Sequence, residues 1–194
     1  MKTKICLLLI IGLCFIAKAG FCEEKVIFGF EESVPSWEIP DWCFEKDECV
    51  AESVAISSKF FKEGKTSLEV MSNFSGGKWT SAYVEVQQFF DWTPYKTISV
   101  DMYVPKETPF GLQARIILTV GENWTWTEMT RLVKLVPGEW MTITANLAPG
   151  STDWRKTEVT DAFRADVRKM GIRVEADKRP EYSGPIYIDN VRLE

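Results

Sequence analysis

The 194-residue chain carries 23 basic and 28 acidic residues, and 45% of it is hydrophobic. These proportions are typical of a globular protein that is long enough to bury a sizeable core. The chain contains no histidine. This absence excludes a Ser-His-Asp triad, a Cys-His pair and any histidine-ligated metal centre.

The amino-terminal residues follow the pattern of a secretory signal peptide. Lys2 and Lys4 precede an apolar run over residues 5–16, and Ala17-Lys-Ala offers a cleavage site. The apolar run is too short to span a bilayer comfortably. We therefore expect residues 1–19 to be a signal peptide and residues 20–194 to form a single exported domain. The mature protein should be secreted or periplasmic, with no membrane association once the signal is removed.

The charge of the mature chain limits which partners it can bind, and its cysteines indicate whether it forms a disulfide. Removing residues 1–19 leaves 20 basic and 28 acidic residues, a net charge of −8, which argues against nucleic acid as a partner. Of the three remaining cysteines, Cys43 and Cys49 are close enough to close a small loop, and export permits a disulfide between them. Cys22 is then either a free thiol near the new terminus or is lost by cleavage after it.

Short apolar runs separated by turn residues recur along the chain. We expect strands at 26–30, 52–57, 67–72, 79–88, 97–104, 112–120, 124–135, 140–147, 171–176 and 186–193. Regular short strands with such punctuation predict an all-β sandwich. Only residues 161–170 have the spacing of a short helix, from Asp161 to Met170.

The segment from Val34 to Cys49 is rich in proline, tryptophan and acidic residues and shows no periodicity. We interpret it as a long loop that the disulfide holds in place. It contains Trp37 and Trp42, which either cover an edge of the core or contact a ligand at its rim. We favour the first interpretation for both.

Residues 112–128 show the clearest pattern in the chain. Five apolar residues from Leu112 to Val120 alternate with residues that include Gln113 and Arg115, and Trp124, Trp126 and Glu128 follow on one face after a turn. Flat apolar rings beside planar hydrogen-bonding groups suit a sugar, which has apolar C–H faces and a rim of hydroxyls. The alternative is that the two tryptophans fill the other half of the sandwich core.

Five segments occur in an order that is familiar from one family. They are Phe28-Gly-Phe-Glu-Glu, Glu63-Gly-Lys-Thr-Ser-Leu, Asp91-Trp-Thr-Pro-Tyr, Pro137-Gly-Glu-Trp and Gly184-Pro-Ile-Tyr-Ile-Asp-Asn-Val-Arg-Leu. Over essentially the whole mature chain, the sequence resembles the non-catalytic carbohydrate-binding modules of the galactose-binding-like jelly-roll type, particularly those attached to β-glucanases and mannanases. The resemblance implies a β-sandwich jelly roll, no enzymatic activity, and a polysaccharide or oligosaccharide as partner.

The resemblance also implies that the ligand lies on the concave face of one sheet. The side chains expected there are Trp79, Tyr83, Glu85, Gln87, Gln113, Arg115, Trp124, Trp126, Glu128, Arg173 and Glu175. The residues between them, such as Val84, Ile116 and Val174, are suitably apolar for the core. We expect the aromatic rings to stack on sugar faces, while an ion-paired polar floor orients contacts to the hydroxyls.

A structural calcium ion is a further implication of the resemblance. The matching carboxylates are Glu31 near the first strand and Asp189 in the last, with the backbone around Lys65 as a carbonyl donor. Calcium prefers several oxygen ligands, and an ion at this place would join the two ends of the chain. The alternative is that both carboxylates are solvated or stabilise turns.

Two other functions compete with sugar binding. A glycoside hydrolase needs two suitably spaced carboxylates, and Glu85, Glu128 and Glu175 share the expected face. An exported structural or protein-interaction domain would keep the fold without a sugar site. Tyr83 and the hairpin tryptophans in an open groove would favour sugar binding, whereas a cover formed by residues 34–49 would favour the structural role. The sequence indicates neither the glycan nor the oligomeric state.

Overall fold

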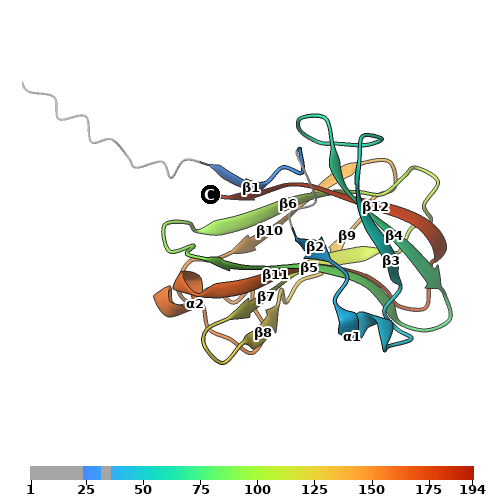
Figure 1. Cartoon of the computed structure of the whole chain (residues 1–194). Coiled ribbons are helices and arrows are strands. Elements are labelled where there is room, and N and C mark those ends of the chain that lie inside the picture. Colours follow the sequence, from blue (N-terminus) through green and yellow to red (C-terminus); the bar gives the residue numbers. More distant parts are fainter. Residues whose placement is uncertain (1–23, 32–35) are drawn as a thin grey trace, which may run out of the picture.

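The computed structural model describes residues 24–31 and 36–194, which form two six-stranded sheets packed face to face (Figure 1). The first sheet has the order β10 (Trp140–Asn146), β6 (Thr97–Tyr103), β12 (Glu181–Leu193), β4 (Ser67–Ser75) and β3 (Ala51–Ser57), and β1 (Lys25–Phe28) also pairs with β12. The second sheet has the order β2 (Trp37–Glu38), β5 (Thr80–Phe90), β11 (Val167–Ala176), β7 (Gln113–Val120) and β8 (Thr125–Glu128), and β9 (Val133–Lys134) also pairs with β7. All of these strand pairs are antiparallel.

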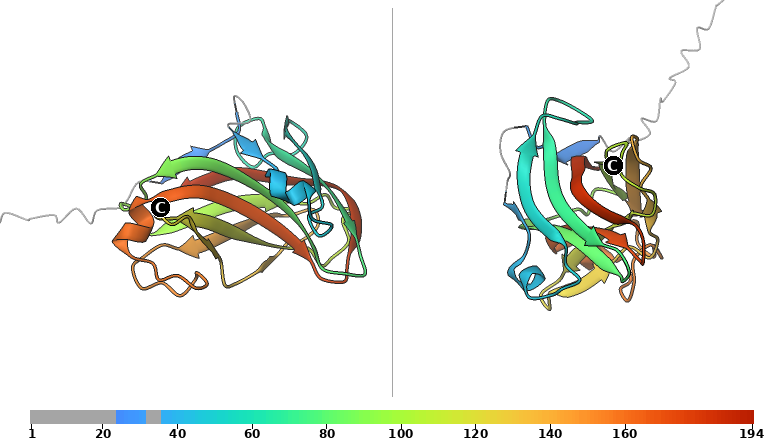
Figure 2. Two further views of the ribbon diagram at one scale, coloured as in Figure 1. Left: turned by 60° about the horizontal axis from the view of Figure 1, so that its bottom comes forward. Right: turned by 90° about the vertical axis from the view of Figure 1, so that its right-hand side faces the viewer.

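The core lies between the two sheets, whose strands curve across the molecule (Figure 2). Because side chains alternate along a strand, every second residue of each strand faces inward. Ile116 in β7 and Ile172 in β11 are directly paired and buried. They belong to one apolar cluster with Ile188 of the first sheet. The predicted all-β sandwich is therefore confirmed.

The strands follow the expected order, with differences in their number and bounds. Residues 124–135 form two short strands, β8 and β9, rather than one. The predicted helix over 161–170 ends early, since α2 covers only Asp161–Ala165, and Thr160 caps it by accepting a hydrogen bond from the Phe163 amide at 3.1 Å. The residues from Val167 onward belong to β11 because that strand pairs with β5 on one side and β7 on the other, and this pairing outweighs the helical spacing.

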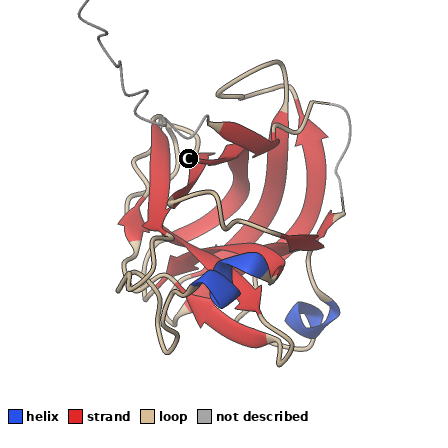
Figure 3. Ribbon diagram, turned by 90° about the vertical axis from the view of Figure 1, so that its left-hand side faces the viewer, coloured by secondary structure: helices blue, strands red, loops and turns tan. Residues whose placement is uncertain are grey.

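The segment before β3 is more ordered than a loop. It contains β2 and the short helix α1 (Asp41–Phe44), and the predicted disulfide joins Cys43 to Cys49 with a Cα–Cα distance of 5.2 Å. Trp37 is buried in the core, as expected. Cys43 packs with Tyr83 and Ile117, so α1 covers part of the outer face of the second sheet. Figure 3 shows both helices on the outside of the sandwich.

The predicted signal peptide at residues 1–19 and Cys22 lie outside the described residues. Within residues 24–31 and 36–194, no helix has both the length and the apolar character needed to cross a membrane.

Candidate functional site

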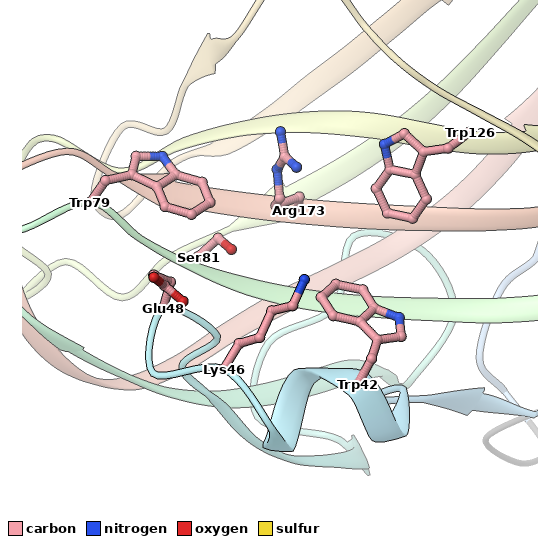
Figure 4. A pocket seen from close by; sticks show the side chains of 7 residues that line it. All are labelled: Trp42, Lys46, Glu48, Trp79, Ser81, Trp126 and Arg173. Carbon is pink, nitrogen blue, oxygen red and sulfur yellow. The ribbon is translucent and has the colours of Figure 1, made fainter.

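A cavity of about 660 Å³ opens on the outer face of the second sheet (Figure 4). Its lining residues are Trp42, Lys46, Glu48, Trp79, Ser81, Trp126 and Arg173. The three indoles come from different places: Trp42 from α1, Trp79 from the residue before β5, and Trp126 from β8. Each is 37–41% exposed. Three large apolar rings thus face solvent around one hollow.

Tyr83 supports two of these indoles from below. Its ring centroid lies 5.4 Å from that of Trp42 and 5.5 Å from that of Trp126, and the two indoles are 6.3 Å apart in an edge-on arrangement. Tyr83 itself is only 1% exposed, and its hydroxyl donates to Glu85 Oε2 at 2.9 Å. Burial, reinforced by the neighbouring Glu85 carboxylate, raises the pKa of Tyr83 well above its ordinary value. Tyr83 is therefore a neutral support beneath the indoles.

The remaining indole is fixed by polar contacts. Trp79 Nε1 donates to Glu175 Oε2 at 3.1 Å, and the Arg173 guanidinium lies 5.9 Å from the Trp79 ring centroid. On the opposite wall, Lys46 Nζ lies 5.0 Å from the Trp42 ring centroid. A cation over an indole face is a favourable contact. A positively charged side chain therefore lies beside each of these two rings at the cavity wall.

Two arginines and two glutamates form an ion-paired floor beneath the indoles. Arg115 Nη1 lies 3.1 Å from Glu128 Oε1, and Arg115 Nε lies 2.9 Å from Glu175 Oε1 at an angle that is poor for a hydrogen bond. Arg173 donates to Glu175 Oε1 at 2.9 Å and to Glu128. Burial lowers the pKa of Arg115, and the charges of Glu175 and Glu128 oppose this effect. The network orients Arg173, which reaches the cavity.

Several predicted site residues lie elsewhere on the same sheet. Glu85 is buried beside the cavity, and its carboxylate pairs with Lys169 Nζ at 2.5 Å. Gln87 is exposed and Gln113 is half-buried, and neither lines the cavity. Trp124 also lies outside it and contacts Phe89 and Arg168 instead. Trp124 ends the turn before β8 at a φ of +52°, whereas Trp126 lies within β8.

Trp42 is the principal site residue that the sequence interpretation missed. We expected it to cover the edge of the core, but it stands over Tyr83 and lines the cavity. The segment that carries it does cover Tyr83, yet it leaves Trp126 exposed and adds an indole of its own. The available signal was its position next to Cys43, since the disulfide holds α1 against the sheet.

Glu31 and Asp189 stabilise the connection between β3 and β4. The Glu31 carboxylate accepts hydrogen bonds from the backbone amides of Lys65 and Thr66 at 3.0–3.3 Å, and Asp189 Oδ2 accepts from those of Lys62 and Glu63 at 2.7 and 3.1 Å. Lys65 thus presents an amide to Glu31. Burial raises the pKa of Asp189, and the Glu31 charge adds to this effect, while the amide bonds oppose it. The described residues contain no group of three or more acidic or cysteine side chains suited to a metal, and calcium binding stays a prediction.

Comparison with solved structures identifies the fold. The CBM27-1 module of Caldicellulosiruptor saccharolyticus, solved with mannohexaose, is 20% identical with a TM-score of 0.60 over 89% of this chain and 97% of its own. A cellulose-specific module, CBM28, is 16% identical with a TM-score of 0.62 over 86% and 91%. A family 11 module from Clostridium thermocellum, solved with a mixed-linked tetrasaccharide, is 16% identical with a TM-score of 0.55 over 88% and 94%.

A search of curated protein sequences found no match. The likeness to these solved structures confirms the predicted jelly-roll sandwich. The expectation that the chain is not an enzyme agrees with the family that its sequence matches. Residues 28–190 match the family described as "Mannanase, galactose-binding domain-like". This match covers most of the chain and both sheets. The chain therefore belongs to the mannanase galactose-binding-domain-like family of carbohydrate-binding modules.

Proposed function

We propose that this protein is an exported carbohydrate-binding module that holds a β-linked oligosaccharide or polysaccharide in the cavity. The observation that carries the proposal is the set of three partly exposed indoles, Trp42, Trp79 and Trp126, around one hollow. Sugar rings stack on such indoles through their C–H faces. Arg173 and Glu48 line the same cavity and are suited to hydrogen bonds with hydroxyls.

A β-linked mannan is the first candidate ligand. The family description names mannanases, and the CBM27-1 structure contains mannohexaose. The other two related structures are described with cellulose and with a mixed-linked tetrasaccharide. These structures are less than 25% identical to this chain, so their ligands do not identify its own ligand. They define the sugars whose binding should be compared.

Calorimetric titration of residues 20–194 with mannohexaose, cellohexaose and a mixed-linked glucan tetrasaccharide tests this function. We expect the wild-type protein to bind mannohexaose most tightly and the Trp42→Ala, Trp126→Ala double variant to lose that binding while keeping its fold. Phe61→Ala is the matched control, since Phe61 is 42% exposed and lies outside the second sheet. Equal binding by the double variant and the control would contradict the proposed site.

Export is the second part of the proposal. It is supported by the basic and apolar pattern of residues 1–19 and by the Cys43–Cys49 disulfide. Expression of the full chain in a bacterial host, followed by fractionation and mass measurement, should yield a shortened protein outside the cytoplasm. A full-length protein in the cytoplasm would contradict export.

We also propose a structural calcium ion at Glu31 and Asp189. The support is that both carboxylates face the same segment, since they accept hydrogen bonds from backbone amides within residues 62–66, and a hard divalent cation would neutralise both. Calcium should therefore raise the melting temperature, and EDTA should lower it. The Asp189→Asn variant should respond to neither. An identical melting temperature for the wild type in calcium and in EDTA would exclude the site.

A further inference from the structure

A second aromatic group lies on the outer face of the second sheet, away from the cavity. It consists of Phe89 from β5, Trp124 from the turn before β8, and Arg168 from β11. Phe90 packs against the core, so its neighbour Phe89 points to the opposite, outer face. Phe89 is 64% exposed and Trp124 is 41% exposed. We call these three residues the distal group.

The distal group is held in a defined geometry. The Phe89 and Trp124 ring centroids are 6.2 Å apart with an interplanar angle of 78°. The Arg168 guanidinium lies 5.4 Å from the Phe89 centroid and 5.2 Å from the Trp124 centroid. Asp166 fixes this guanidinium by accepting two hydrogen bonds, at 2.9 Å from Nε and 2.8 Å from Nη2. A planar cation and two rings are thus arranged before any ligand arrives.

The backbone of Trp124 adds a second observation. Its φ of +52° lies in the left-handed region, which a bulky residue adopts only at a free-energy cost. Glycine would fit this turn position better. Strained residues that persist at a surface often serve a function. Here the strained position places a large exposed ring beside Phe89.

The outer face between the cavity and the distal group is lined by polar groups. Trp42 borders both the cavity and a second hollow of about 470 Å³, which is also lined by Glu85 and Lys169. Lys169 is paired in register with the exposed Gln87, and Phe89 follows two residues later. From Tyr83 to Phe89, β5 advances by about 20 Å. The same strand therefore runs from the aromatic support of the cavity, past polar side chains, to the distal group.

We propose that Phe89, Trp124 and Arg168 form a distal subsite for sugar units of the same glycan chain that occupies the cavity. This inference rests on the proposed function. The two rings provide stacking faces, and the fixed guanidinium is placed to donate to hydroxyls. The separation along β5 means that only a chain of several sugar units reaches both places. The subsite would make the protein favour long β-linked chains over short ones.

Titrations with mannotriose, mannohexaose and soluble β-mannan test the distal subsite. The Phe89→Ala, Trp124→Ala double variant should bind mannohexaose and β-mannan about tenfold more weakly, a loss of about 1.4 kcal/mol of ring stacking. Its affinity for mannotriose should be unchanged. Trp126→Ala should weaken binding of all three ligands. Phe89→Tyr keeps the ring and should retain wild-type affinity, while Phe61→Ala controls for loss of an exposed aromatic ring elsewhere.

The outcomes separate this inference from the proposed function. If the wild type binds β-mannan and the double variant binds it equally well, the distal subsite is overturned and the cavity proposal stands. If the double variant loses affinity for mannotriose to the same extent, the distal group acts through the cavity, which also overturns a separate subsite. A wild type that binds none of the three ligands overturns both proposals for mannan.

Discussion

The cavity and the distal group place aromatic rings on the same sheet face but support them differently. Beneath the cavity, Arg115 is buried and ion-paired with two glutamates, and Tyr83 is buried beneath two indoles. At the distal group, one ion pair between Arg168 and Asp166 lies at the surface. The cavity residues thus rest on buried ion pairs and a buried ring, whereas the distal group rests on a single ion pair at the surface.

This difference predicts where stability and binding are coupled. Buried ion pairs are expensive to break because the remaining partner keeps an uncompensated charge. Surface pairs contribute little to stability. Changes beneath the cavity should therefore alter both folding and binding, while truncation of a side chain in the distal group should alter binding to long chains with little effect on folding.

The largest expected effect is on folding. Arg115→Met should lower the free energy of unfolding by about 3–5 kcal/mol, because Glu128 and Glu175 lose a buried partner. Arg168→Met, the matched change in the distal group, should leave the melting temperature nearly unchanged. Urea denaturation of both variants measures the contrast. Similar losses for the two variants would remove the distinction between the two regions.

Loss of the disulfide should produce the next largest effect. The Cys43→Ser, Cys49→Ser double variant should unfold about 2 kcal/mol more easily, because a short closed loop is released in the unfolded chain. It should also bind mannotriose more weakly, since α1 no longer holds Trp42 firmly over Tyr83. Denaturation and titration of the same preparation test both expectations. Unchanged mannotriose binding would show that the disulfide does not position Trp42.

Removing one cavity indole should have an effect of similar size, but on binding alone. Trp126→Ala should weaken mannotriose binding by about 2 kcal/mol, or roughly thirtyfold, as for a tryptophan that dominates an interface. Trp124→Ala should leave mannotriose binding unchanged, because Trp124 lies outside the cavity. Calorimetry distinguishes the two variants. A larger loss from Trp124→Ala would reverse the assignment of the two regions.

Tyr83→Phe tests whether this residue is a support rather than a sugar contact. The variant should lose about 1 kcal/mol of stability at neutral pH, since Glu85 loses one hydrogen bond, and should keep its affinity for mannotriose. The folded state raises the Tyr83 pKa above 10.0, so the unfolded chain ionises first as pH rises. The stability advantage of the wild type should therefore be complete below about pH 10 and shrink above it. Denaturation at pH 8 and pH 11 measures this change, and an advantage that grows with pH would contradict it.

The smallest expected effect concerns the backbone at Trp124. Trp124→Gly should be more stable than Trp124→Ala by about 1 kcal/mol, because glycine adopts a positive φ without the steric cost. Both variants remove the same ring and should bind β-mannan equally weakly. Thermal denaturation compares them. Equal melting temperatures would show that the turn carries no strain.

Strand alternation predicted the parts of the molecule that depend on local sequence. It assigned Val84, Ile116 and Val174 to the core, and it grouped Arg115, Arg173 and Glu175 on the opposite face, where the structure pairs them. These assignments succeeded because the period of a strand fixes which face each residue occupies.

Features that depend on tertiary packing were not predicted. Trp42 reaches the cavity because α1 packs on the second sheet, and the apolar pattern of residues 34–49 does not reveal that contact; only the neighbouring Cys43 hinted at it. Trp124 lies on the predicted face but outside the cavity, in a left-handed turn before β8. The predicted helix extended too far because pairing of β11 with two strands was not visible in its apolar spacing.

The most direct test of sugar binding in the cavity is a crystal structure of the protein with mannohexaose. We predict electron density for consecutive sugar rings against Trp42, Trp79 and Trp126, with hydroxyls within hydrogen-bond distance of Arg173. Sugar bound on the first sheet, or a sugar-free cavity in crystals of a protein that binds mannohexaose in solution, would contradict the proposed site.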